Sequence, residues 1–192
     1  PDVIGPALES INPTLNRRAI DASITRLKEI EGSDLIAKNS IFMDMLQNGV
    51  ETSWFDGKEE HTDIVRLVDY DNPEKNCFHV VNQWTYIECG TNKRPDVIVF
   101  VNGLPLVLFE LKSPARADAD SEDAYQQIQN YKRQIPSLFV YNAFCVTSDM
   151  LHTKVGTITA NESRFVEWKS VDGSYEATQY ADWKTPLDGM FP

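Results

Sequence analysis

The stretch RPDVIVFVNGLPLVLFELK, residues 94–112, carries the strongest fold signal in the sequence. Two nearly continuous apolar runs, Val97–Val101 and Leu104–Phe109, flank the dipeptide Asn102-Gly103. Asn-Gly between hydrophobic runs is a strong signal for a β-hairpin. Strands with apolar residues on both faces are typical of the middle of a sheet that is covered on both sides. The stretch therefore predicts a buried hairpin.

Three charged side chains interrupt this apolar stretch, namely Asp96, Glu110 and Lys112. A buried charge without a partner is costly even after the protein relaxes. Glu110 and Lys112 are two residues apart on one strand and share a face. A two-residue turn would pair Asp96 with Phe109 and turn it away from Glu110, whereas a turn with an odd number of residues would bring both acids to one face. Because Pro105 cannot donate to a strand ladder, the odd turn is favoured, and convergence of the three charges is predicted to require it.

Convergence of these three groups would create a site for a divalent cation. Two neighbouring carboxylates repel each other unless a cation lies between them, and Mg²⁺ prefers oxygen ligands. Bound Mg²⁺ can generate hydroxide and polarise a phosphodiester, while a nearby lysine neutralises charge on the phosphate. The alternative is that Asp96 caps a turn and that Glu110 and Lys112 form a salt bridge. An acid followed by acid-x-Lys is common by chance, but the apolar surroundings and the turn favour a site.

The rest of the sequence predicts an α/β domain. Helical spacing of apolar residues covers residues 14–30, 40–47 and 121–134, and Pro136 ends the last of these helices. Further strands are predicted at residues 50–55, 63–69, 78–87 and 139–146, and the tail from Ser148 is predicted to form loops with short elements. Helices, several strands, a helix and a strand, in this order, favour a mixed sheet flanked by helices.

Charge and cysteine content limit the function. The 192 residues carry a formal net charge of −11, whereas phosphate contacts need clustered Lys and Arg. Any action on DNA is therefore expected to need other domains or subunits that hold the DNA. Cys77, Cys89 and Cys145 are odd in number and lack the spacing of metal ligands, which predicts a reduced, cytoplasmic setting. No apolar run is long enough to span a bilayer, so no membrane partner is predicted.

Several motifs together resemble a known family. Pro95-Asp96 followed by Glu110-Leu111-Lys112 is similar to the PD-(D/E)xK signature of nucleases. The whole 94–112 stretch resembles the N-terminal nuclease domain of the R subunit of type I restriction-modification enzymes. The same resemblance is carried by ALESINP at 7–13, NGV at 48–50, NQW at 82–84, AYQQIQNYKRQIPSLFVYNAFCVTSD at 124–149 and RFVEWK at 164–169. It covers residues 7–169.

The resemblance implies a restriction-endonuclease-like core, which is a mixed β-sheet flanked by helices. It implies that Asp96 and Glu110 bind Mg²⁺, with Mn²⁺ as a substitute. The backbone carbonyl of Leu111 would be a further metal ligand, and Lys112 would be the catalytic lysine. The endonuclease domain is expected to span residues 1–170, and residues 171–192 are expected to begin the connection to a motor domain.

The resemblance also assigns roles to residues outside the hairpin. Gln127 and Tyr131 match the Q-x-x-x-Y motif of the family, and their spacing places them on one helix face. They could position DNA or support the catalytic lysine, and the alternative is that Tyr131 only packs the helix on the sheet. Candidate phosphate contacts, each with solvated surface as its alternative, are Arg94, Arg116, Lys132 and Arg133.

Some features depart from the family pattern. The family usually has a helix with a Glu before the region that ALESINP resembles, and that acid can join the metal site. This sequence starts at Pro1, so the site is expected to lack that acid, and nothing in the sequence supports Glu9 or Glu31 as its replacement. Asp149 is followed by Met150, where the family commonly has Gly. A G-x-x-x-x-G-K-[ST] loop is absent, so ATP is expected to act only through the motor domain.

The leading hypothesis is an endonuclease domain that cuts foreign duplex DNA with Mg²⁺. Its expected partners are the methylation and specificity subunits of the type I complex and its own ATP-driven motor domain. One alternative is a catalytically silent docking module within the restriction complex. The other is a RecB-like exonuclease, which shares the Q-x-x-x-Y pattern.

Overall fold

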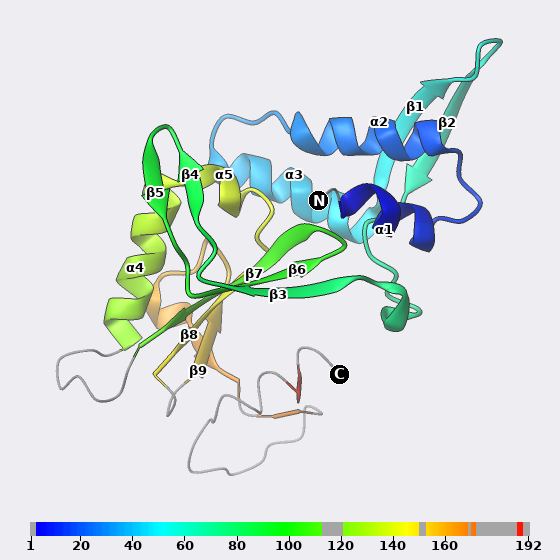
Figure 1. Cartoon of the computed structure of the whole chain (residues 1–192). Coiled ribbons are helices and arrows are strands. Elements are labelled where there is room, and N and C mark those ends of the chain that lie inside the picture. The colour runs from blue at the N-terminus through cyan, green and yellow to red at the C-terminus, as the bar shows by residue number, and fades with distance from the viewer. Residues whose placement is uncertain (1–2, 113–120, 150–152, 169, 172–187, 190–192) are drawn as a thin grey trace. The chain divides into compact units, whose positions relative to one another are not determined.

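A computed structural model of the chain describes residues 3–112, 121–149, 153–168, 170–171 and 188–189 (Figure 1). The chain divides into two compact units. The first contains the residues up to Val80 together with Val99–Leu106, and the second contains Val81–Ile98 and the residues from Val107 onward. Most of the predicted connection at 171–192 lies outside the described residues, so this boundary stays a prediction.

The first unit begins with three helices and a two-stranded hairpin. Asn16 caps the second helix by accepting a hydrogen bond from the backbone N–H of Arg18, and this helix packs against both strands of the hairpin. The helices predicted at 14–30 and 40–47 are confirmed with shifted ends, and the first helix was not predicted. The elements are α1 (Ile4–Ile11), α2 (Arg17–Lys28), α3 (Leu35–Asn48), β1 (Val50–Phe55), β2 (Glu60–Val65) and the short helix η1 (Pro73–Lys75).

The strand predicted at 63–69 is wrong in its position. The second strand of the hairpin starts earlier, because Phe55 pairs directly with Glu60 across the turn. Asp56 closes this turn, since its Oδ1 accepts hydrogen bonds from the backbone N–H groups of Lys58 (2.7 Å) and Glu59 (2.9 Å). Side-chain hydrogen bonds of this kind fix where a strand begins, and apolar periodicity does not report them.

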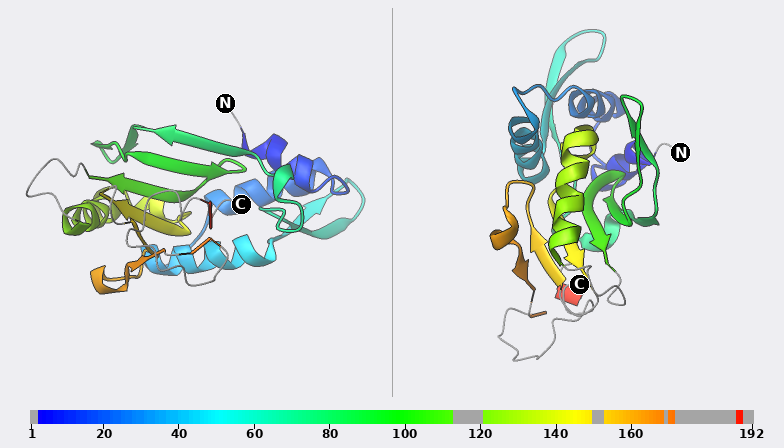
Figure 2. Two further views of the ribbon diagram at one scale, coloured as in Figure 1. Left: turned by 90° about the horizontal axis from the view of Figure 1, so that it is seen from below. Right: turned by 90° about the vertical axis from the view of Figure 1, so that its left-hand side faces the viewer.

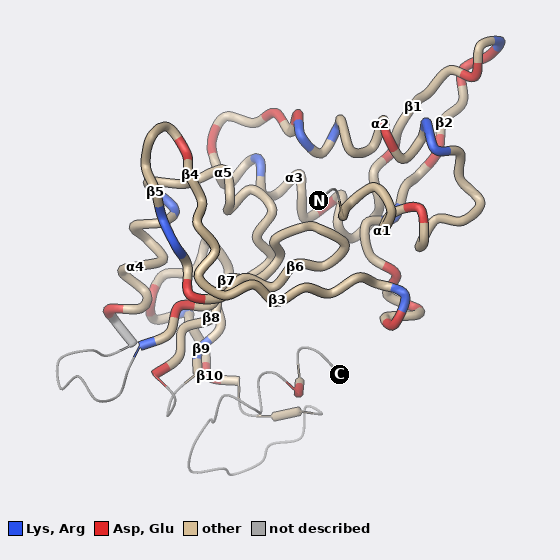
Figure 3. The backbone as a smooth tube through the Cα atoms, in the orientation of Figure 1, with Lys and Arg blue, Asp and Glu red and all other residues tan. Residues whose placement is uncertain are grey.

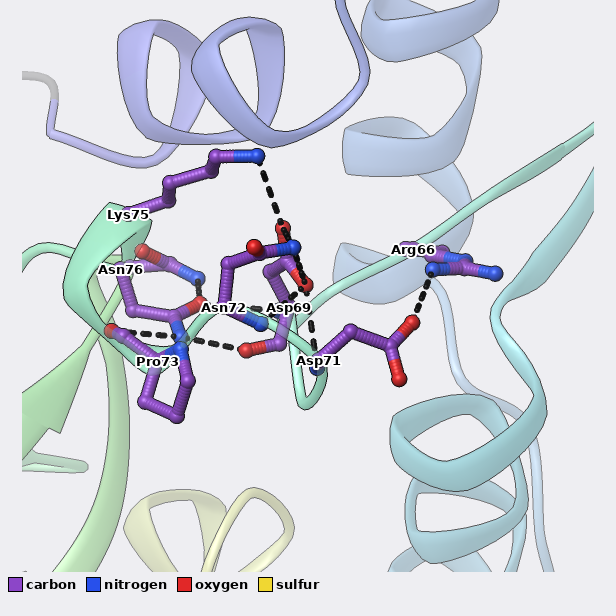
Figure 4. Close-up of polar contacts among 8 residues, drawn as sticks. Arg66, Asp69, Asp71, Asn72, Pro73, Lys75 and Asn76 are labelled. Atoms are coloured by element: carbon purple, nitrogen blue, oxygen red, sulfur yellow. Dashed lines mark hydrogen bonds and ion pairs between the residues drawn. The ribbon is translucent and has the colours of Figure 1, made fainter. Parts of the chain in front are cut away.

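Side-chain hydrogen bonds also close the turn-rich segment between β2 and β3 (Phe78–Asn82), as Figure 4 shows. Asp69 Oδ1 accepts hydrogen bonds from the backbone N–H groups of Asp71 (3.1 Å) and Asn72 (3.0 Å). Asn76 uses both ends of its amide on Asp69, accepting from its N–H (2.9 Å) and donating to its carbonyl (2.8 Å). The segment is thus ordered by polar side chains that satisfy backbone groups.

The Asn102-Gly103 turn is held by the same network. Asn102 is fully buried, and its Nδ2 donates to the carbonyl of Leu67 and to Asn76 Oδ1, both at 2.8 Å. Its Oδ1 accepts from the N–H of Cys77 at 2.7 Å. Both turn residues have positive φ, 53° for Asn102 and 85° for Gly103, as a tight two-residue hairpin turn requires.

The hairpin therefore has a two-residue turn, and the prediction of an odd turn is wrong. Strand β6 (Val97–Val101) ends directly before Asn102, and β7 (Leu104–Leu111) begins directly after Gly103. The physical reason is that Asn and Gly both tolerate a left-handed backbone, and the buried bonds of Asn102 favour the shortest connection. Pro105 lies within β7 without lengthening the turn.

Within the described residues the largest sheet has six strands, in the order β10-β9-β8-β7-β6-β3. Strands β7 and β8 (Phe144–Ser148) are parallel, whereas β8 pairs antiparallel with β9 (Thr153–Gly156), and β9 with β10 (Val166–Glu167). The parallel pair is joined through α4 (Ser121–Gln134) and α5 (Pro136–Phe139), and α4 packs against β8 (Figures 1 and 2). The predicted α/β class with a mixed sheet and flanking helices is confirmed, as expected for a restriction-endonuclease-like core.

Two strand predictions in this region are corrected. The strand predicted at 78–87 is two strands, β3 and β4 (Tyr86–Glu88), which are separated at Gln83, where φ is 51°. Strand β4 forms a separate hairpin with β5 (Thr91–Lys93). The strand predicted at 139–146 begins only at Phe144, because Phe139 is the last residue of the helix α5 and residues 140–143 form a turn. A short apolar run does not distinguish a buried helix from a strand.

None of the helices within the described residues is both long and apolar enough to cross a membrane.

Candidate metal and catalytic site

Asp96 lies in a bend directly before β6, and neutral donors hold both oxygens of its carboxylate. Oδ1 accepts a hydrogen bond from the side-chain amide of Gln83 (2.6 Å), and Oδ2 accepts one from the backbone N–H of Leu111 (2.8 Å). Asp96 thus reaches the end of β7 despite the two-residue turn. A two-residue turn was expected to direct Asp96 away from Glu110. It does not do so, because Asp96 lies outside the regular strand, where side chains no longer alternate between the two faces of the sheet.

Glu110 is a buried carboxylate near the end of β7, with 4% of its surface exposed. Its Oε1 accepts a hydrogen bond from Lys112 Nζ at 3.0 Å. Its Oε2 is buried without a hydrogen-bond partner among the described residues. Burial raises the pKa of Glu110, and the charge of Asp96 raises it further, while Lys112 acts in the opposite direction. The carboxylate is therefore costly to keep ionised unless a cation joins it.

Lys112 directly follows β7 and continues its pairing with β8. Its backbone N–H donates to the carbonyl of Ser148 at 2.8 Å. Its side chain is 25% exposed, compared with 5% for that of Glu110. The ammonium group therefore bonds to the buried carboxylate while remaining accessible from solvent.

The predicted Q-x-x-x-Y pair lies beside these acids. Tyr131 on α4 is 4% exposed, and burial raises the pKa of its hydroxyl to about 12, with the Glu110 and Asp96 carboxylates adding to the shift. Gln127 forms a side-chain hydrogen bond to Tyr131. The hydroxyl lies close enough to Glu110 to favour its carboxylate form, although it makes no hydrogen bond to Oε2. Tyr131 thus packs in the core and also contacts the acidic site.

The Lys and Arg residues predicted to contact phosphate differ in their exposure to solvent. Lys132 is half-buried, and its ammonium donates to the carbonyl of Ile158 and to Gln129 Oε1. Burial lowers the pKa of Lys132. Arg94 and Arg133 are exposed, and Arg116 lies outside the described residues. That any of these residues contacts a DNA phosphate stays a prediction. For Lys132, the ammonium group already donates hydrogen bonds within the protein.

Two other acids, which the sequence analysis considered as additional metal ligands, remain without support. Glu9 on α1 forms an ion pair with Arg17, and Glu31 is exposed. That the Leu111 carbonyl is a metal ligand also stays a prediction. The structure shows a contact of Leu111 with Asp96, but this contact is made by the backbone N–H group.

The residues at Asp96 and Glu110 fit a hard divalent cation. Both offer carboxylate oxygens, which Mg²⁺ and Mn²⁺ prefer, and Glu110 Oε2 is a buried acceptor that still lacks a partner within the described chain. Another cluster, Asp56, Glu59 and His61, can bring three ligand atoms within 4.8 Å. It lies largely exposed at a turn whose backbone already uses Asp56. The pair that contains the buried Glu110 is therefore the stronger candidate.

Gln83 is the contact that sequence reasoning missed. The motif NQW at 82–84 contributed to the family resemblance, but no role was assigned to its glutamine. Its position beside Asp96 depends on a left-handed backbone at the end of β3, which the local sequence does not signal.

With this geometry established, comparison with known proteins decides the family. Residues 4–164 match the family model described as type I restriction enzyme R protein N terminus. The chain belongs to this family. The resemblance seen in the sequence is thereby confirmed.

Two relatives of this R-protein N-terminal domain are close in sequence. Over 167 residues it is 39% identical to the type I restriction enzyme HindI endonuclease subunit of Haemophilus influenzae. Over 169 residues it is 36% identical to a protein of Methanocaldococcus jannaschii that carries the name MjaIXP endonuclease subunit. Each match covers 86% of this chain but only 16% of the relative. The chain therefore corresponds to a small part of these endonuclease subunits.

The raised pKa of Glu110 predicts how stability depends on pH in the absence of metal. As pH rises from the ordinary value of 4.5 through the raised folded value, the unfolded chain releases its proton first. The folded state therefore binds more protons in this window, and the free energy of unfolding falls. Glu110→Gln has no such proton, so its free energy of unfolding is expected to fall less between about pH 4 and about pH 7.

Denaturant titrations at both pH values, with a chelator present, measure this difference. The exposed control Glu60→Gln is expected to follow the parent. Identical pH dependence in the parent and in Glu110→Gln would contradict the proposed environment of Glu110.

Proposed function

We propose that this R-protein N-terminal domain is an endonuclease domain that hydrolyses phosphodiester bonds of duplex DNA with Mg²⁺, or Mn²⁺ as a substitute. The observation that supports the proposal most is the buried Glu110 oxygen without a partner in the described residues, beside Asp96 and Lys112. A purely structural salt bridge has no need to leave that oxygen unpaired. The relatives are named as endonuclease subunits, which supports the same activity.

In this mechanism Asp96 and Glu110 would hold the cation, with the Leu111 carbonyl as an additional ligand. A divalent cation held there would supply Lewis-acid chemistry that activates water for attack on the phosphodiester. Lys112 would orient the attacking water or neutralise the charge that develops on the phosphate. Tyr131, bonded to Gln127, supports Glu110 from the helix side.

DNA is expected to be held mainly by other parts of the restriction complex. The chain carries a net charge of −11, and along its described part the Lys and Arg segments alternate with Asp and Glu segments (Figure 3). We therefore assign the methylation and specificity subunits, and the motor domain of the same subunit, as partners. ATP would act only through that motor. The three free cysteines favour a reduced, cytoplasmic setting for this complex.

Cleavage of closed circular duplex DNA tests this proposal. A full-length endonuclease subunit carrying this domain, assembled with its partners, is expected to cut the circle with Mg²⁺ and to stop when the metal is chelated. Cutting of linear DNA alone would indicate an exonuclease. Cutting at the parent rate by both Asp96→Asn and Glu110→Gln would indicate that this domain is a docking module and that another part of the complex cuts.

A further inference from the structure

Gln83 has a backbone conformation that calls for an explanation. It follows the last residue of β3 and has a φ of 51°, in the left-handed region that residues other than glycine adopt rarely. Such conformations cost free energy and persist where the surroundings enforce them, which is often at functional sites.

Two hydrogen bonds to a single residue accompany this conformation. The backbone N–H of Gln83 donates to the carbonyl of Asp96 at 2.8 Å. Its side-chain Nε2 donates to Asp96 Oδ1 at 2.6 Å. The left-handed backbone thus allows one residue to hold both the main chain and the side chain of Asp96.

The second oxygen of Asp96 is held from another element. The N–H of Leu111, at the end of β7, donates to Oδ2 at 2.8 Å. Each carboxylate oxygen therefore accepts one N–H donor and keeps a lone pair for a further ligand. Both donors are neutral, and within the described residues Asp96 forms no salt bridge to Lys or Arg that would offset the charge of its carboxylate. This arrangement fixes the carboxylate and leaves it able to bind a cation.

We propose that Gln83 is a positioning residue for the divalent-cation site, and that its amide orients Asp96 for binding the metal. The inference rests on the proposed function. Mutation of a residue that orients a metal ligand typically lowers the metal affinity about 10- to 100-fold.

The test replaces Gln83 by Gly. Glycine adopts positive φ freely, so the backbone at the end of β3 is kept and only the amide side chain is lost. Cys89→Gly is a matched control, because Cys89 is exposed, belongs to the same unit and also has a left-handed backbone, with a φ of 48°. Gln83→Asn is a second variant, since Asn also tolerates this backbone but its amide is shorter.

Manganese affinity, measured by the paramagnetic resonance signal of free Mn²⁺, is the first readout. The dissociation constant is expected to rise about 10-fold in Gln83→Gly and Gln83→Asn and to stay at the parent value in Cys89→Gly. In the full-length subunit, the Mg²⁺ concentration for half-maximal DNA cleavage is expected to rise by a similar factor. The rate at saturating Mg²⁺ is expected to be largely recovered.

Two results would overturn the inference in distinguishable ways. Parent-like Mn²⁺ affinity in both Gln83 variants, together with loss of binding in Asp96→Asn, would remove the role of Gln83 and leave the metal site intact. No Mn²⁺ binding by the parent would overturn the metal site itself, and the role of Gln83 with it.

Discussion

Changing Lys112 to Ala in a full-length endonuclease subunit is expected to slow DNA cleavage about 100- to 1,000-fold, while Mn²⁺ binding persists. The ammonium group lies 3.0 Å from Glu110 Oε1 and is partly accessible, so it can meet a phosphate while it pairs with the acid. The change removes a positive charge that would neutralise the negative charge developing on the phosphate. It does not remove a ligand of the metal.

The measurement is single-turnover cleavage of closed circular DNA at saturating Mg²⁺. Lys58→Ala, an exposed lysine at the β1–β2 turn, is the matched control and is expected to cut at the parent rate. Any ATP hydrolysis by the same subunit should be unchanged in Lys112→Ala, because the change lies outside the motor. Cleavage at the parent rate by Lys112→Ala would remove Lys112 from the mechanism and favour a structural salt bridge.

Changing Asn102 to Ala is expected to lower the free energy of unfolding by about 3 kcal/mol. The variant loses the side-chain bonds to Leu67, Asn76 and Cys77, and it leaves the Cys77 N–H without its buried acceptor. It also forces alanine into a left-handed backbone, which asparagine and glycine tolerate better. The loss is large because Asn102 is both the turn residue of the hairpin and a fully buried polar contact.

Denaturant unfolding of the parent and of two Asn102 variants separates these contributions. Asn102→Gly adopts the left-handed backbone without strain but lacks the side-chain hydrogen bonds. Its free energy of unfolding should therefore lie between those of the parent and of Asn102→Ala. Asn92→Ala, at an exposed position of β5, is expected to change stability by less than about 0.5 kcal/mol. An Asn102→Ala variant as stable as the parent would show that the network contributes little.

The hairpin was predictable because its signals are local. Apolar runs and Asn-Gly define β6 and β7 within a few residues of each other, and α4 is marked by its apolar stripe and by Pro136. The break between β3 and β4 was not predictable, since Gln83 has no local propensity for a left-handed backbone. Helix α5 was missed because its apolar residues resemble the start of the strand that follows.

The structure brings the predicted residues Asp96, Glu110 and Lys112 together, but not for the geometric reason expected from the sequence. Strand alternation required an odd turn to bring Asp96 toward Glu110. The structure instead places Asp96 in a bend, where Gln83 and Leu111 determine its direction. Such long-range hydrogen bonds join residues far apart in sequence, so periodicity carries no information about them.

Calorimetric titration of Mn²⁺ into this chain tests the central claim most directly, which is that Asp96 and Glu110 form a divalent-cation site. Asp96→Asn removes one of the two carboxylates, and Asp56→Asn removes an acid from the exposed cluster at the β1–β2 turn. The account predicts that the parent and Asp56→Asn bind Mn²⁺ with similar affinity and that Asp96→Asn does not bind it. Undiminished binding by Asp96→Asn, or no binding by the parent, would contradict it.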